Sequence, residues 1–87
     1  MTDQTQRDEA NVTASVLGIL RDLTGRADLM VDPAMLLSDL PDWDSIRQIE
    51  AIASAEEAWD VTVQTRDLDR IFTVADIIAA ILRARPA

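Results

Sequence analysis

The sequence predicts a small all-α domain with three main helices, one short helix and a long loop between the first two helices. Apolar residues recur every three or four positions over 12–23, 45–59 and 74–85, which is typical of amphipathic helices. The segment 26–44 lacks this spacing. The chain has 87 residues, 48% of them hydrophobic, which is enough for one domain with a simple core. We place this domain at 11–85, after a frayed tail over 1–10 that holds almost no apolar residues.

The first predicted helix spans 12–23. Val12, Val16, Leu20 and Leu23 form its apolar stripe, and Gly25 follows where a helix often ends in a left-handed glycine. Residues 26–44 then contain Pro33 and Pro41, which favour a loop, with one helical turn after Pro33. Seven apolar side chains should pin this loop across the core: Leu29, Met30, Val31, Met35, Leu36, Leu37 and Leu40.

The second predicted helix begins at Asp44 or Ser45 and ends near Trp59. Its inner face is assigned to Ile46, Ile49, Ile52, Ala53 and Ala55. Along the whole chain, large apolar residues are assigned to the core by default. These residues are Ile49, Trp59, Leu68, Ile71, Ile77, Ile78 and Ile81.

The last third of the chain holds a short helix and the third main helix. Residues 61–63 favour extended structure but are too short and isolated to predict a sheet. A brief helix is expected over 67–71. Thr73 then precedes the last helix, with Asp76 three residues later in a near capping box, and Pro86 ends it.

The composition argues against catalysis by this chain alone. It has no His, Cys, Lys or Tyr, so no serine has a basic partner that could activate it, and we expect no enzyme. The net charge of −8 disfavours nucleic acid and anionic membranes, and with no membrane-length apolar run we expect a cytoplasmic monomer. Residues 39–60 contain one basic residue and seven acidic residues, which are Asp39, Asp42, Asp44, Glu50, Glu56, Glu57 and Asp60. This excess of acids suggests docking to basic patches on partner proteins.

Ser45 admits a simple structural interpretation. Serine is a favoured helix N-cap, and Gln48 three residues later matches a capping box. A calcium loop is a second possibility, because Asp39, Asp42 and Asp44 lie close together in sequence. No register of that loop places acids at the required ligand positions, so no metal site is predicted.

Three segments of the chain resemble the acyl carrier protein family. Asp44-Ser45-Ile46 at a helix start is similar to the Asp-Ser-(Leu/Met/Ile) triplet of the family's modification motif. Residues 55–63 (AEEAWDVTV) and 67–78 (DLDRIFTVADII) are similar to later family segments at the same spacing. The three segments occur in the family's order, the resemblance as a whole extends over roughly residues 12–83, and it implies an acyl-carrier-like four-helix bundle.

This resemblance implies that Ser45 carries a 4′-phosphopantetheine arm, transferred covalently from coenzyme A by a phosphopantetheinyl transferase. Asp44 would help to present the serine. The arm would hold acyl groups as thioesters for fatty-acid, polyketide or related biosynthetic enzymes. Docking of the transferase and of acyl-loading and acyl-processing enzymes with basic patches would use the second helix, through Ile46, Arg47, Glu50, Ala53 and Glu57.

Two departures from the family pattern point to a specialised member. The family often has glycine two residues before the Asp-Ser pair, where this chain has Asp42, and Arg47 replaces a commonly acidic or neutral residue. Two alternatives stay open at this stage. One is an aminoacyl or peptidyl carrier with the same arm, and the other is a carrier-like interaction domain that has no arm.

Overall fold

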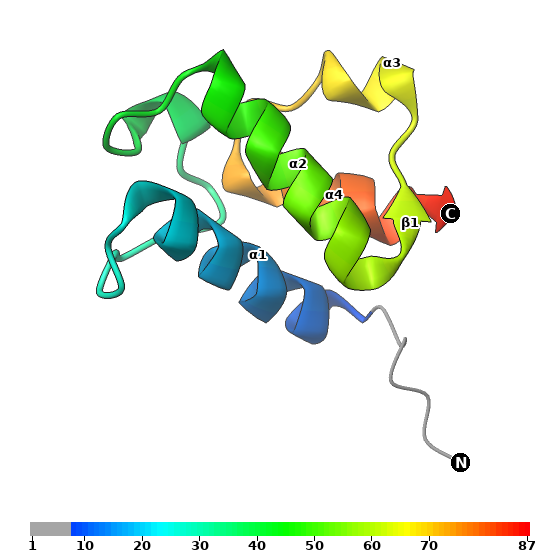
Figure 1. Cartoon of the computed structure of the whole chain (residues 1–87), viewed down its shortest axis with the longest axis horizontal. Coiled ribbons are helices and arrows are strands. Elements are labelled where there is room, and N and C mark those ends of the chain that lie inside the picture. Colours follow the sequence, from blue (N-terminus) through cyan, green and yellow to red (C-terminus); the bar gives the residue numbers. More distant parts are fainter. Residues whose placement is uncertain (1–7) are drawn as a thin grey trace.

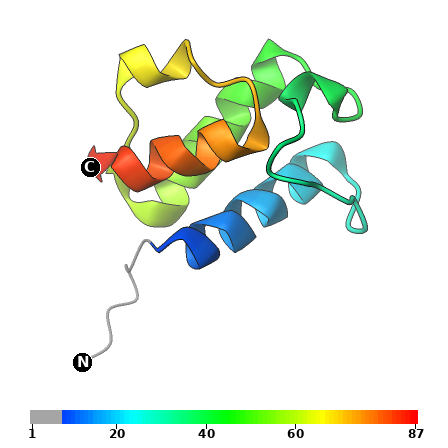
Figure 2. The ribbon, with the colours of Figure 1, turned by 180° about the vertical axis from the view of Figure 1, so that it is seen from behind.

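The computed structural model describes residues 8–87, which fold mainly into helices (Figure 1). Three helices pack on one another: α1 (Glu9–Thr24), α2 (Ser45–Trp59) and α4 (Val74–Arg83). The one-turn helix α3 (Thr65–Leu68) lies beside α2, and the view from behind shows α4 lying across both α1 and α2 (Figure 2). Within the described residues, no helix is long and apolar enough to cross a membrane.

Helix α1 begins three residues earlier than predicted. The Asp8 side chain accepts a hydrogen bond from the Asn11 N–H at 2.8 Å and thereby caps the helix, so Glu9 and Ala10 are helical although they add nothing to the apolar stripe. Residues 1–7 of the predicted tail lie outside the described residues. Gly25 ends the helix at φ 69°, in the left-handed conformation that the sequence predicted.

The long loop between α1 and α2 is tied to the start of α4 by backbone hydrogen bonds. The N–H of Leu37 donates to Phe72 O at 2.9 Å, and the N–H of Val74 donates to Met35 O at 3.1 Å. The helical turn that was predicted after Pro33 is a 3₁₀ turn at Leu37–Asp39. These bonds fix the loop against the segment that joins α3 to α4.

The C-terminal segment corrects two predictions. Helix α4 ends at Arg83, and Arg85–Pro86 form a strand, β2, that pairs antiparallel with β1 (Val61–Thr62). The segment that we considered isolated therefore finds its partner more than twenty residues away in sequence. Helix α3 also lies slightly earlier than the predicted 67–71, and the Asp67 carboxylate joins it to Arg83 of α4 at 3.5 Å.

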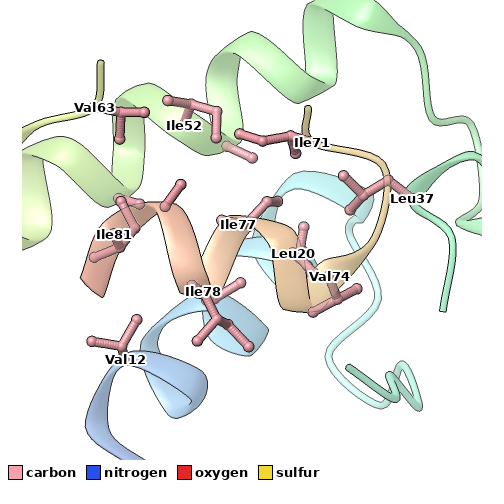
Figure 3. Close-up of a cluster of buried hydrophobic side chains, with 14 of the residues drawn as sticks. Val12, Leu20, Leu37, Ile52, Val63, Ile71, Val74, Ile77, Ile78 and Ile81 are labelled. Atoms are coloured by element: carbon pink, nitrogen blue, oxygen red, sulfur yellow. The ribbon is translucent and has the colours of Figure 1, made fainter. Parts of the chain in front are cut away.

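The core lies where α1, α2 and α4 meet (Figure 3). Ile77 and Ile81 of α4 are 1% and 0% exposed, and Ile78 of the same helix is also buried. Thr73 and Asp76 form the complete capping box that starts α4, so the most apolar helix of the chain begins at a residue fixed by local hydrogen bonds.

Candidate functional site

Ser45 is the first residue of α2 and is exposed, but it does not cap the helix. The preceding residue, Asp44, has extended backbone, and its carboxylate accepts the Arg47 N–H at 2.8 Å. The Asp44 carbonyl also accepts the Gln48 N–H at 3.1 Å. The interpretation of Ser45 as an N-cap with Gln48 in a capping box is therefore wrong. Among residues 8–87, no group forms a hydrogen bond with the Ser45 hydroxyl.

A tight turn leads the chain into this site. The Trp43 N–H donates to Leu40 O at 3.3 Å across Pro41 and Asp42. Asp42 has φ 57°, a left-handed conformation that favours glycine and that aspartate tolerates better than most residues. Asp42 occupies the position where the resembling family often has glycine. The departure in sequence thus keeps the backbone conformation that glycine would favour.

Two hollows flank Ser45 and share Ser45 and Gln48 in their walls. The first, here called the α2–α3 hollow, has a volume of about 350 Å³ and is lined by Ser45, Gln48, Ile49, Ile52, Ala53, Glu56 and Leu68. The second, the loop hollow, has a volume of about 320 Å³ and is lined by Leu36, Leu37, Ser38, Trp43, Asp44, Ser45, Gln48, Ile71 and Phe72. The Gln48 side chain donates to Ile71 O at 3.3 Å, which holds the α3–α4 connection beside Ser45.

Exposed apolar side chains gather around Ser45. Six large apolar residues are exposed in the described part of the chain, and only Met30 among them lies neither in a wall of the two hollows nor next to Ser45. We call the other five the apolar ring: Leu36, Ile46, Ile49, Leu68 and Phe72.

The exposure of Ile46 and Ile49 shows that the predicted inner face of α2 is wrong. Ile46 and Ile49 are 62% and 68% exposed, Ala53 is exposed, and Leu68 of α3 is 39% exposed rather than part of the core. The buried stripe of α2 consists of Ala51, Ile52 and Ala55. At about 100° per residue, Ile46 lies about 170° from the centre of that stripe. The small alanines allow α1 and α4 to approach α2, and this orientation turns the larger Ile46 outward.

The predicted docking residues lie along the exposed side of α2, but their charges are not equally available. The Arg47 guanidinium forms an ion pair with Glu50 at 2.8 Å, and both side chains are nearly half exposed. The Glu56 carboxylate accepts the Val63 N–H at 2.8 Å and so holds the residue that follows β1 against α2. Glu57, at the far end of α2, is exposed without such a contact among the described residues.

Trp43 and Asp76 contribute polar groups near the loop hollow, and the sequence predicted a role only for Asp76, in the capping box of α4. The Trp43 side chain is half-buried, and its indole Nε1 is buried with no hydrogen-bond partner among residues 8–87. Asp76 accepts the N–H groups of Phe72 and Thr73, both at 2.9 Å, and these bonds hold its pKa below the ordinary value of 3.8. The Asp76 cap thus fixes the backbone that carries Phe72 of the apolar ring.

The described residues contain no cluster of three or more acidic side chains that could hold a metal ion. The chain matches no protein-family model, no curated protein and no solved structure.

Proposed function

We propose that this chain is a carrier protein whose Ser45 hydroxyl receives a 4′-phosphopantetheine arm from coenzyme A. The observation that carries the proposal is that Asp44, and not Ser45, caps α2. The Ser45 hydroxyl therefore has no structural hydrogen bond to lose. Serine is a favoured N-cap residue, but here the capping position is held by Asp44. The resemblance of Asp44-Ser45-Ile46 to the acyl carrier modification motif supports the same assignment.

The surroundings of Ser45 fit the proposed group. Its hydroxyl is exposed at the first position of a helix, where the free backbone N–H groups and the helix dipole favour an attached phosphate. In the transfer, the Ser45 oxygen forms a bond to the pantetheine phosphorus of coenzyme A while the pyrophosphate bond breaks. Adenosine bisphosphate leaves, and the serine proton passes to a base of the transferase. This chain therefore has only to expose the hydroxyl on a fixed turn.

The terminal thiol of the arm would carry the cargo as a thioester. An acyl cargo is favoured by the apolar side chains of the α2–α3 hollow, where Ile49, Ile52 and Leu68 lie beside Ser45. Burial of an acyl chain there would remove apolar surface from water at about 25 cal/mol per Å². An amino acid with a free ammonium group would gain less from such a wall.

Intact-mass measurement tests the proposal directly. The protein is incubated with coenzyme A, magnesium and a broad-specificity phosphopantetheinyl transferase. We expect the mass of one phosphopantetheine to be added to the wild type and to Ser38→Ala, and none to Ser45→Ala. Ser38 is the matched control, because it is an exposed serine in the wall of the same loop hollow. Modification at another residue, or none, refutes the carrier function and leaves an interaction domain without an arm.

A further inference from the structure

We propose that the apolar ring is the docking surface for the enzyme that modifies Ser45, and that this enzyme binds it through an apolar, uncharged contact surface rather than a basic patch. This inference rests on the proposed carrier function. It replaces the expectation, drawn from the acidic composition of residues 39–60, that docking is mainly electrostatic.

The first argument is the position of the exposed apolar residues. Ile49 and Phe72 are 68% and 64% exposed, and they line different hollows that meet at Ser45. Ile46, at 62% exposure, directly follows Ser45 on α2. Single exposed apolar residues are common on protein surfaces, but a group that surrounds one reactive side chain marks an interaction site. An enzyme that transfers phosphopantetheine to the Ser45 oxygen must approach across this group.

The second argument is that the charged side chains at the start of α2 are already engaged within the chain. The Arg47–Glu50 ion pair makes this part of α2 locally neutral. Asp44 accepts the Arg47 N–H, and Asp76 accepts the Phe72 N–H, so both carboxylates are held as helix caps. A lysine or arginine of a partner would have to compete with Arg47 for Glu50.

The remaining acid of the predicted docking stripe is too distant to guide contact at Ser45. Glu57 lies twelve residues further along α2, about 18 Å along the helix axis at 1.5 Å per residue. Charges separated by more than about 8 Å in water are largely screened at physiological salt. The α2 side chains next to Ser45 therefore favour an apolar contact surface that leaves the Arg47–Glu50 pair intact.

Steady-state kinetics of the transferase reaction test this docking mode. The probe is a broad-specificity phosphopantetheinyl transferase with coenzyme A and magnesium, and the variants are Ile49→Gln and Phe72→Gln. Met30→Gln is the matched control, because Met30 is 84% exposed but lines neither hollow. Circular dichroism verifies that each variant is folded.

We expect each ring variant to raise the KM for this protein about tenfold, as for a residue near the centre of an interface. Met30→Gln should stay within about twofold of the wild type, because an isolated exposed side chain lies outside the contact. Raising NaCl from about 50 to about 500 mM should change kcat/KM less than about threefold, because an apolar contact is not screened.

Two other outcomes have different meanings. If the wild type is modified at Ser45 but the ring variants behave like Met30→Gln, and salt slows the reaction steeply, docking is electrostatic. That result overturns the apolar docking surface and leaves the carrier function standing. If the wild type is not modified at all, the carrier function is refuted and the docking surface falls with it.

Discussion

Replacement of Asp44 tests the local structure that frees the Ser45 hydroxyl. In Asp44→Ala the acceptor of the Arg47 N–H is lost, and a donor in the first turn of α2 is left without its protein partner. The backbone at Asp44 is extended, with φ −148° and ψ −177°, which alanine adopts without strain. The substitution therefore isolates the side chain.

The expected loss of unfolding free energy is about 1 kcal/mol. Replacing an N-cap aspartate with alanine costs about 0.5–2 kcal/mol, and the interaction of its charge with the helix N-terminus forms part of that cost. Asp44 is exposed, so the middle of this range applies. For a domain of this size, such a loss lowers the thermal midpoint by about 4–8 °C. Asp44→Asn keeps an acceptor oxygen and should lose less than half as much.

Ser45→Ala completes the comparison. Because the Ser45 hydroxyl forms no hydrogen bond with the described residues, and alanine has the higher helix propensity, this variant should be at least as stable as the wild type. Thermal and urea denaturation, followed by circular dichroism, measure all three variants. The reasoning is refuted if Ser45→Ala loses stability while Asp44→Ala does not, because Ser45 would then be the true cap.

Two further predictions concern other charged groups. The hydrogen bonds from Phe72 and Thr73 lower the pKa of Asp76, so its ionised form stabilises the fold above pH 3.8, and this contribution disappears as the pH falls through the lowered value. The stability difference between wild type and Asp76→Asn in urea should therefore shrink in acid, and a constant difference would contradict the assignment. Asp60 ends α2 at φ 54° and places a negative charge at the negative end of the helix dipole. Asp60→Gly should raise the unfolding free energy by about 0.5–1 kcal/mol, and a loss of stability in thermal denaturation would show that this carboxylate has a stabilising contact.

The sequence was sufficient where a structure depends on neighbours within about one helical turn. The apolar spacing predicted α1, α2 and α4, Gly25 predicted the end of α1, and Thr73 with Asp76 predicted the start of α4. The start of α2 at Ser45 was also predicted, although two adjacent residues could each have served as the cap. Apolar periodicity does not distinguish between them, because both side chains lie outside the buried stripe.

The tertiary structure decided which side of α2 is exposed and what surrounds Ser45. Apolar spacing predicted Ile46 and Ile49 inside, but the helix buries its alanines where α1 and α4 pack closely, and the isoleucines face outward. The loop hollow combines the segments 36–38 and 71–72, which are held together by backbone hydrogen bonds. The pairing of β1 with β2 likewise joins residues that are distant in sequence. Such contacts depend on how the completed helices pack, because the backbone groups that form them carry no signal in the residue types.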